Sequence, residues 1–176
     1  MRIKRGRNYK RIVKFFRLHF DFQEPFNVLV DGNFIQEFVR ARFEMKSMLS
    51  RVLGGIVHLV ITDCVYKEIK ELQDRLLPGT FEMASSYARE PCCHDEIIGA
   101  QDCLKRKIGK KNRKKYFIGT QDGELRRHLR HIPSVPLMYF IKGLLSLEEP
   151  SAITNVKSER KEEIKSKDKS LKPLLT

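Results

Sequence analysis

Asn27-Val28-Leu29-Val30-Asp31-Gly32-Asn33-Phe34 is the most informative segment of this chain. Strand-forming residues end on an acid and a glycine, and a helical pattern follows at once. A short apolar run of this kind is typical of a buried parallel strand, and open α/β sheets place their sites at the carboxyl ends of such strands. Asp31 is therefore the first candidate for chemistry. The alternative is that Asp31 and Asn33 only turn the chain and cap the next helix.

The composition indicates a globular, strongly basic protein. The chain has 176 residues, 41% of them hydrophobic, which suits one domain of about 130 to 150 residues with tails. Its 35 Lys and Arg against 22 Asp and Glu give a net charge of +13. This excess favours a polyanionic partner, with nucleic acid ahead of an acidic membrane. No apolar run approaches the roughly 18 residues that span a bilayer, so we expect an intracellular protein without a signal peptide or membrane helix.

Apolar periodicity predicts a series of alternating strands and helices. Strands are expected at 57–61, 116–119 and 137–141, and helices at 34–53, 63–72, 80–89 and 95–108 and around Leu125 and Leu129. This order predicts an α/β fold, a mostly parallel sheet flanked by helices on both faces. We divide the chain into a basic N-terminal arm and helix at 1–24, the α/β domain at 25–149, and a charged tail at 150–176. The tail is expected to be disordered or a solvated helix.

Two further acids occupy positions comparable to that of Asp31. Glu68 projects near the apolar face of the helix predicted at 63–72, and Asp122 follows the strand predicted at 116–119. Hard divalent cations take oxygen ligands, so these carboxylates are candidates for a Mg²⁺ or Mn²⁺ site that activates water against a phosphodiester. The alternative for Glu68 is an ion pair at the rim with one of the many cations.

Three groups of cations are candidates for RNA contact. Residues 1–17 contain eight Lys or Arg, no acid and several aromatics, which favours an RNA-contacting arm over a merely solvated face. Residues 105–115 contain eight Lys or Arg among eleven and are expected to form a basic surface loop. The candidates are Arg2, Lys4, Arg5, Arg7, Lys10 and Arg11 in the arm, Lys105, Arg106, Lys107, Lys110, Lys111, Arg113, Lys114 and Lys115 in the loop, and Arg126, Arg127 and Arg130 on the last helix.

Several motifs, taken in order, resemble a known family. They are Val-Asp-Gly-Asn-Phe at 30–34, Ile-Thr-Asp-Cys-Val at 61–65 with Glu68 after it, Thr-Gln-Asp at 120–122, and Ile-Pro-Ser-Val-Pro-Leu-Met-Tyr at 132–139. Together they resemble the PIN-domain proteins of the small-subunit processome. Residues 14–26, Lys-Phe-Phe-Arg-Leu-His-Phe-Asp-Phe-Gln-Glu-Pro-Phe, resemble the U-three-associated protein twenty-three family.

This resemblance covers about residues 1–150. It implies a PIN-like, Rossmann-like fold and a nucleolar RNA-binding factor needed for early cleavages of pre-rRNA toward 18S rRNA. The implied partners are the pre-rRNA, an H/ACA snoRNA and other processome proteins, with no membrane. A protein-interaction module whose basic surfaces meet acidic partners is a further alternative.

The resemblance implies four metal-binding acids, of which Asp31, Glu68 and Asp122 match three. In the catalytically competent sister branch the third acid is the first Asp of Ala-Asp-Asp-Cys, whereas the matching stretch here has Gln101 in that position. A neutral amide is a poorer Mg²⁺ ligand, so we favour a degenerate site that binds RNA without cutting it. An active metal-dependent endoribonuclease, with Asp102 rotating inward, is the alternative.

Helical geometry leads to the same interpretation independently. Ile97, Leu104 and Ile108 define the inner face of the predicted helix. Gln101 lies about 40° from the centre of that face and Asp102 about 140° away. The amide, and not the neighbouring carboxylate, is therefore expected to face the acids.

The cysteines Cys92, Cys93 and Cys103 cluster around His94, a pattern that in a reducing compartment suggests a metal before a disulfide. The resemblance implies a Cys-Cys-His-Cys zinc site in a small zinc-knuckle-like insertion. Cys92, His94 and Cys103 match its last three ligands. No cysteine lies between Cys64 and Cys92 to match the first, so Cys93 is the candidate fourth ligand. The alternative is that Cys92 or Cys93 is a small buried hydrophobe and His94 a polar cap.

Overall fold

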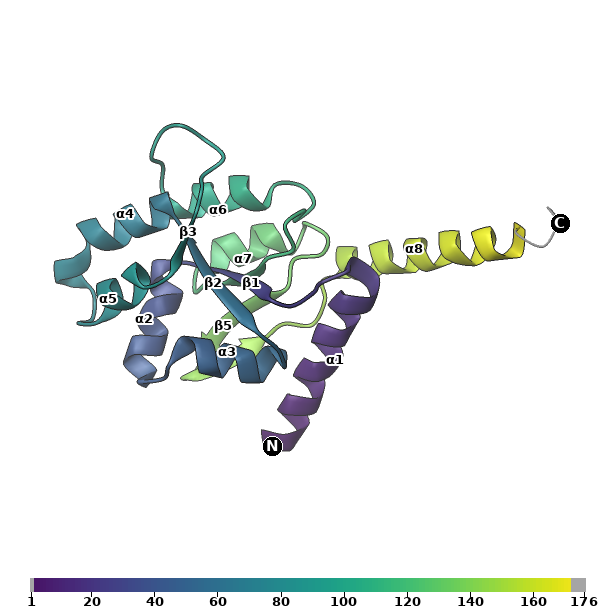
Figure 1. The fold of residues 1–176 in the computed structure, drawn as a ribbon, viewed down its shortest axis with the longest axis horizontal. Helices are drawn as coiled ribbons and strands as arrows, with labels where there is room; N and C mark the ends of the chain where they lie inside the picture. Colours follow the sequence, from purple (N-terminus) through teal and green to yellow (C-terminus); the bar gives the residue numbers. More distant parts are fainter. Residues whose placement is uncertain (1, 172–176) are drawn as a thin grey trace.

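The strand that precedes Asp31 lies in the middle of the sheet (Figure 1). In the computed structural model, which describes the backbone of residues 2–171 and the side chains of residues 5–168, β1 (Phe26–Val30) lies between β2 (Val57–Thr62) and β4 (Phe117–Gly119). Both neighbours run parallel to β1. The apolar side chains of β1 are buried, as expected for a strand covered on both faces.

The described residues form one six-stranded sheet in the order β3-β2-β1-β4-β5-β6. All pairs are parallel except the hairpin of β5 (Leu137–Ile141) and β6 (Leu144–Leu147). The predicted fold class, a mostly parallel sheet flanked by helices, is confirmed. The edge strands β3 (Ala88–Glu90) and β6 were not predicted, and residues 88–89 were assigned to a helix. Both strands are short and partly exposed, so they carry little apolar alternation.

The connections contain more breaks than apolar periodicity alone predicts. The helix predicted at 34–53 is two helices, because Arg42 adopts a left-handed conformation (φ 55°) that ends the first. The helix predicted at 95–108 begins only at residue 100. The helices between the strands are α2 (Gly32–Ala41), α3 (Met45–Leu53), α4 (Asp63–Glu71), α5 (Thr80–Ser85), α6 (Ala100–Ile108) and α7 (Gly123–Leu129), with a 3₁₀ turn at Gln73–Arg75.

The two terminal segments are helical and contact each other. The basic arm forms α1 (Arg2–Phe20), whose apolar side chains enter the common core. The segment predicted as disordered or a solvated helix contains α8 (Ala152–Leu171), which extends away from the sheet (Figure 1). Lys161 joins the two helices: its Nζ donates to the carbonyl oxygen of His19 (3.0 Å) and lies 4.7 Å from the centre of the Phe20 ring.

Close packing aligns the ends of β1 and β4. The ring of Phe34, in the first turn of α2, packs on Gly119 at the end of β4, where a Cβ atom would lie only 2.4 Å from the ring. Glycine is therefore needed at position 119 for α2 to approach the sheet. This contact brings Asp31 next to Thr120, the residue that follows β4.

Candidate functional site

Asp31 caps α2 and is held from two sides. Its Oδ1 accepts the backbone N–H of Phe34 (2.7 Å), and its Oδ2 accepts the hydroxyl of Thr120. Only 6% of Asp31 is exposed. Burial raises the pKa of the Asp31 carboxyl to about 6, and the charges of Asp122 and Glu68 add to this rise although the two hydrogen bonds oppose it. Both the capping role and the site role predicted for Asp31 are thus compatible with its geometry.

The three predicted acids line one pocket of about 230 Å³. Asp31 comes from the end of β1, Glu68 from α4 and Asp122 from the residue before α7. Glu68 is exposed, and its Oε2 accepts the backbone N–H of Ala100 at the start of α6 (3.1 Å). The structure therefore brings together side chains that are up to 91 residues apart in the chain (Asp31 to Asp122).

Gln101 lines the same pocket and binds one of its acids. Its Nε2 donates to Oδ2 of Asp122 (2.9 Å), while Oδ1 of Asp122 accepts the backbone N–H groups of Glu124 (2.8 Å) and Leu125 (3.0 Å). Both oxygens of Asp122 are thus engaged by protein donors. Asp102 also borders the pocket but is exposed, with Oδ1 3.5 Å from the Lys105 ammonium.

The inner face of α6 differs from the predicted one in one residue. Leu104 and Ile108 are buried as expected, but Ile97 is 51% exposed. The reason is that α6 begins at Ala100. Ile97 therefore belongs to the preceding loop, where helical periodicity does not determine the direction of its side chain. Gln101 still points toward the acids because its position relative to Leu104 and Ile108 lies within the observed helix.

A second cluster lies beside the acidic pocket and contains Cys64, Cys92, His94 and Cys103. Their ligand atoms all lie within 4.8 Å of one another. Cys92 Sγ is 3.6 Å from Cys103 Sγ and 3.9 Å from Cys64 Sγ, and His94 Nε2 is 3.7 Å from Cys64 Sγ. A tetrahedral ion with ordinary zinc bond lengths requires about 3.8 Å between sulfurs and about 3.6 Å between sulfur and nitrogen. This cluster could hold a metal ion.

Cys93 is not part of this cluster. Cys93 is exposed, and the fourth candidate ligand of the cluster is Cys64. Three consecutive residues cannot easily direct all their side chains to one point, whereas Cys64 reaches the cluster from the first turn of α4. A signal was present in the sequence: Cys64 and Glu68 are four residues apart, so they share one face of that helix.

The surroundings of the cluster favour a bound cation. Burial raises the pKa of the Cys103 thiol to about 12 and also raises the pKa of Cys64. The thiols of Cys64 and Cys103 therefore remain protonated unless a cation stabilises their thiolates, whereas hydrogen bonds from its neighbours lower the pKa of Cys92 despite its burial. His94 has its Nδ1 at the carbonyl oxygen of Glu96, which leaves Nε2 directed at the sulfurs. A backbone partner of this kind is how a metal-binding histidine is usually oriented.

The cations predicted to contact RNA fall into two groups. Several are engaged by acids: Arg11 with Glu149, Lys105 with Asp102, Lys107 and Lys114 with Glu90, Lys115 with Asp21, and Arg130 with Glu148. Others are exposed and make no ion pair among the described residues: Arg5, Arg7, Lys10, Arg106, Lys110, Lys111, Arg113 and Arg127. The side chains of Arg2 and Lys4 lie outside the described residues. Sequence alone could not separate these groups, because most of the pairing acids are distant in the chain.

Arg126 is held inside the structure. Its Nη1 donates to the carbonyl oxygen of Thr120 (3.0 Å), and its guanidinium lies 4.1 Å from the centre of the Tyr139 ring. Its residue is only partly exposed. Arg126 therefore fixes the loop that carries Asp122 and is less available for a phosphate than Arg127.

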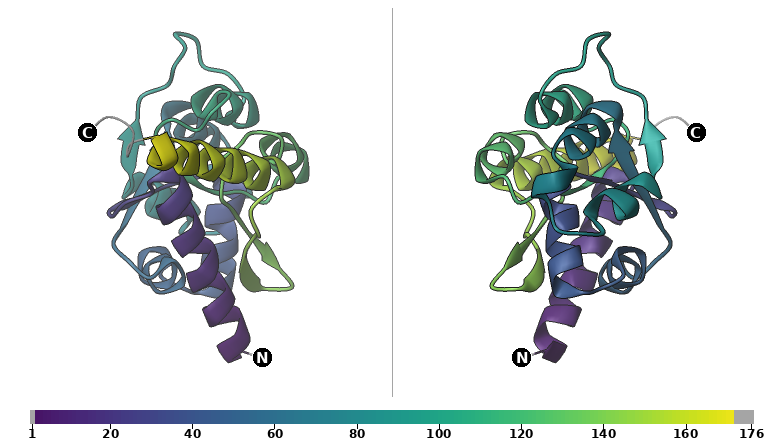
Figure 2. Two further views of the ribbon diagram at one scale, coloured as in Figure 1. Left: turned by 90° about the vertical axis from the view of Figure 1, so that its right-hand side faces the viewer. Right: turned by 90° about the vertical axis from the view of Figure 1, so that its left-hand side faces the viewer.

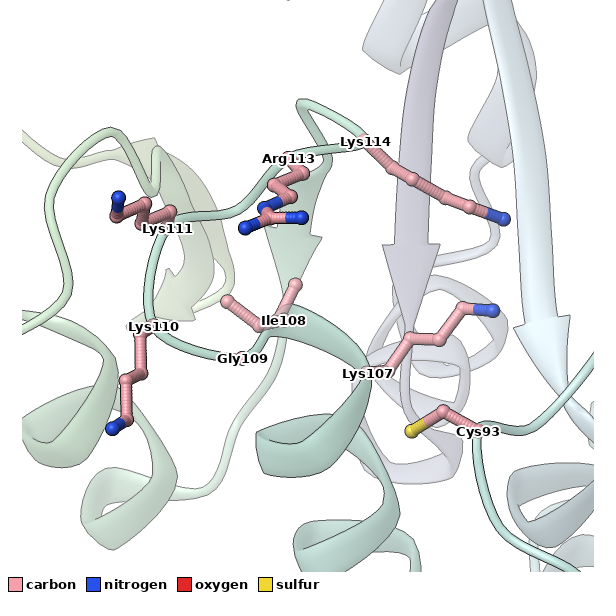
Figure 3. Close-up of a pocket in the computed structure, with 8 residues that line it drawn as sticks. All are labelled: Cys93, Lys107, Ile108, Gly109, Lys110, Lys111, Arg113 and Lys114. Atoms are coloured by element: carbon pink, nitrogen blue, oxygen red, sulfur yellow. The ribbon is translucent and has the colours of Figure 1, made fainter.

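The basic loop after α6 borders a hollow of about 450 Å³ (Figure 3). Lys107 and Lys114 extend to the same side of it and bind Glu90. Burial opposes ionisation of Glu90, but the ammonium groups of Lys114 and Lys107 lower its pKa to about 2. Lys110, Lys111 and Arg113 lie on the loop itself.

Asn112 holds this loop from inside. It is 2% exposed and has a φ of 43°. Its Nδ2 donates to the carbonyl oxygens of Tyr116 (3.0 Å) and Ser134 (2.7 Å), and its Oδ1 accepts the backbone N–H of Tyr116 (3.0 Å). The loop is therefore tied both to β4 and to the segment before β5.

Comparison with known proteins shows first the fold class and then the family of this chain. A solved structure of the PIN domain endonuclease Utp24 has 25% sequence identity and a TM-score of 0.66, covering 73% of this chain and 95% of that one. The fold is therefore that of a PIN domain. The Fcf1 family model matches residues 51–149, so the chain belongs to the Fcf1 family. The resemblance inferred from the motifs is confirmed.

Two relatives illustrate the relationship. The rRNA-processing protein utp23 of Schizosaccharomyces pombe is 32% identical over 167 residues, covering 93% of this chain and 64% of that protein. The rRNA-processing protein FCF1 homolog of Homo sapiens is 31% identical over 135 residues, covering 76% of this chain and 67% of that protein. The chain thus spans less than two thirds of the length of the fission yeast protein. Within the described part of the chain, no helix combines the length and apolarity needed to cross a bilayer.

Proposed function

We propose that this protein is an RNA-binding rRNA-processing factor whose acidic pocket no longer cleaves RNA. The proposal that the pocket does not cleave RNA rests on the hydrogen bond from Gln101 to Asp122 (2.9 Å). An acid at position 101 would place two carboxylates together and call for a cation between them. The Gln101 amide instead satisfies Asp122 directly, which weakens the case for a bound Mg²⁺ or Mn²⁺.

RNA binding is supported by the exposed cations that have no acid partner among the described residues. Lys110, Lys111 and Arg113 share one loop, and Arg106 precedes them on α6. Such a group suits the phosphates of a single strand. The names of the relatives make rRNA the expected RNA. Following the family resemblance, we place the protein in the nucleolus, in early processing toward 18S rRNA, in contact with an H/ACA snoRNA and other processome proteins.

We also propose that the Cys64, Cys92, His94 and Cys103 cluster binds zinc. The spacing of its sulfur and nitrogen atoms supports this identity, since three cysteines and one histidine are a common structural zinc set. When bound, the ion would join α4, α6 and the loop between β3 and α6. Its role would be structural, because all four positions are occupied by protein ligands.

The test is RNA binding and integrity in one assay, with the purified chain and a short single-stranded pre-rRNA fragment. Lys110→Glu with Arg113→Glu should weaken binding about tenfold and lower the salt slope by about 1.4, as expected for two lost phosphate contacts. Lys70→Glu with Lys165→Glu makes the same change of net charge on exposed positions elsewhere and should change binding by less than about twofold. Equal losses in both variants would contradict a contact at this loop.

The second candidate function is a metal-dependent endoribonuclease, which the shared pocket of Asp31, Glu68 and Asp122 favours. The same assay includes Mn²⁺, chelator and Asp31→Asn. We expect intact RNA in every sample. Cleavage that disappears both with chelator and in the variant would establish the endoribonuclease and overturn the non-cleaving assignment.

A further inference from the structure

The first turns of α8 are fixed against the segment that holds the basic loop. The backbone N–H of Ser134 donates to Oγ1 of Thr154 (3.1 Å), and the Ser134 hydroxyl donates to the carbonyl oxygen of Lys111 (3.3 Å). Thr154 and Ser158 are 0% and 5% exposed, so this face of α8 lies inside the structure. Short polar contacts therefore set the position of α8 relative to the loop.

Further along, α8 crosses the C-terminal end of α1 (Figure 2). Lys161 contacts this end through the carbonyl oxygen of His19 and the ring of Phe20. Lys115, the last cation of the loop, reaches the same end: its Nζ donates to the carbonyl oxygen and to Oδ2 of Asp21, both at 2.9 Å. The basic loop, α1 and α8 thus meet at one place.

Three lysines gather where these elements meet. Lys111 lies on the loop, whereas Lys157 and Lys161 are four residues apart on α8 and share one face of that helix. Burial lowers the pKa of Lys157, and the positive charges of Lys161 and Lys111 lower it further. The other two ammonium groups are therefore close enough to Lys157 to repel it.

The acids nearby are engaged by other groups. Asp21 is held by Lys115, whose hydrogen bond is the main cause of its lowered pKa, and the charge of Lys161 contributes less. Glu162 lies 3.3 Å from Nδ1 of His19. Lys111, Lys157 and Lys161 form no ion pair within the part of the chain that the structure describes. A group of cations without carboxylate partners favours a bound anion, because the anion offsets their mutual repulsion.

The position of these lysines favours the phosphates of RNA over the carboxylates of an acidic protein segment. Lys111 is next to Lys110 and two residues from Arg113, the exposed cations already assigned to phosphate contact. Figure 3 shows Lys111 extending from the opposite side of the loop to Lys114. Because an RNA strand has a phosphate at every nucleotide, it can bind cations on successive elements. A strand bound to the loop can therefore continue over Lys111 to α8.

We propose that Lys111, Lys157 and Lys161 form a phosphate-binding cluster through which a bound RNA strand continues from the basic loop onto α8. The proposal rests on the RNA binding proposed for the loop and adds α8 to that surface. Lys157 and Lys161 were not among the cations predicted from the sequence, because acids alternate with cations in this segment.

The test measures the affinity of the full chain for a single-stranded RNA of about 15 nucleotides, by fluorescence anisotropy across a salt series. Lys157→Gln with Lys161→Gln should weaken binding about tenfold and lower the salt slope by about 1.4. The matched control, Lys70→Gln with Lys165→Gln, makes the same charge change at exposed positions and should change binding by less than about twofold. Arginine at both 157 and 161 keeps the charges and should bind within about twofold of wild type.

A single variant keeps the test valid if the double variant does not fold. Lys157→Gln leaves the contacts of Lys161 with α1 intact and should weaken binding about threefold. RNA should also protect Lys111, Lys157 and Lys161 from acetylation, measured by mass spectrometry, while Lys70 stays reactive. Equal protection of Lys70 would overturn the proposal.

The loop variant Lys110→Glu with Arg113→Glu separates this proposal from the one on which it rests. Weaker binding in the loop variant but not in the α8 variants would overturn the α8 cluster and leave RNA binding by the loop in place. Unchanged binding in both would contradict both proposals. Tighter binding of poly-glutamate than of RNA, lost in the α8 variants, would assign the cluster to an acidic protein segment instead.

Discussion

The acidic pocket and the Cys/His cluster are neighbours that differ in how their ligands are satisfied. Both draw side chains from α4 and α6: Glu68 and Gln101 enter the pocket, whereas Cys64 and Cys103 enter the cluster. In the pocket, Asp31 and Asp122 accept protein hydrogen bonds on both oxygens. In the cluster, sulfur and nitrogen atoms face one another at metal-like spacing. The acids of the pocket are thus bound mainly by protein donors, whereas the ligand atoms of the cluster mainly face one another.

Among the changes to these two sites, removing zinc from the Cys/His cluster should change the stability of the protein most. We expect the purified chain to carry one zinc ion, and chelation or Cys64→Ser to lower the free energy of unfolding by several kcal/mol, on the order of 3 to 5, because the ion joins three segments. Zinc content and denaturant unfolding are the measurements. Cys93→Ser is the matched control, since Cys93 is exposed and outside the cluster. Loss of zinc from the Cys93 variant but not from the Cys64 variant would reverse our assignment of the fourth ligand.

Neutralising Asp31 should raise the free energy of unfolding, by less than the loss of zinc lowers it. The folded pKa of Asp31, about 6, lies above its ordinary value of 3.8. Its contribution to stability is therefore present below about pH 4 and lost as the pH rises through 6. Asp31→Asn removes this loss, and the Thr120 hydroxyl can turn to accept the new amide. We expect the variant to be more stable than wild type at pH 8 by on the order of 2 kcal/mol.

Unfolding in chelator across pH 4 to 8 checks this sign. The advantage of the Asp31→Asn variant should shrink toward zero as the pH falls. A variant that is less stable than wild type throughout the range would contradict this expectation. It would mean that the Asp31 carboxylate stabilises α2 as a cap by more than the burial of its charge costs.

Placing an acid at position 101 should have the smallest effect on stability. It would make the pocket resemble the cluster, because two carboxylates would then face each other and favour a bound cation. Gln101→Glu places a second carboxylate against Asp122, so we expect a loss of about 1 kcal/mol in chelator and recovery with Mn²⁺. Thermal unfolding with and without Mn²⁺ measures both. Asp102→Asn, on the exposed side of α6, is the control and should respond to neither. Equal stabilisation of wild type by Mn²⁺ would show that Gln101 does not prevent metal binding.

The central strands were predictable because their apolar runs are continuous. Apart from the exposed His58 and the partly exposed Asn27, the residues of β1, β2 and β4 are buried, and the positions of Asp31 and Asp122 after β1 and β4 follow from that pattern. The edge strands β3 and β6 were not predictable, because they are short and partly exposed.

The composition of the two sites depended on tertiary contacts that sequence spacing does not contain. Cys64 joins the cluster only because the loop before α6 folds back on α4. Likewise, Glu90 neutralises Lys107 and Lys114 from positions 17 and 24 residues away. Asp31 and Asp122 could be found from strand ends and Glu68 from helical periodicity, whereas the fourth ligand and the division of the cations required the structure.

The buried Asn112 has a consequence for the energetics of recognition. Its three hydrogen bonds fix the shape of the loop that carries Lys110, Lys111 and Arg113 before any ligand arrives. A flexible basic segment would lose backbone entropy on binding a polyanion, at about 1 to 2 kcal/mol for each residue that becomes ordered. Here that ordering already occurs when the chain folds, so the loop is preorganised and its affinity is less opposed by conformational entropy.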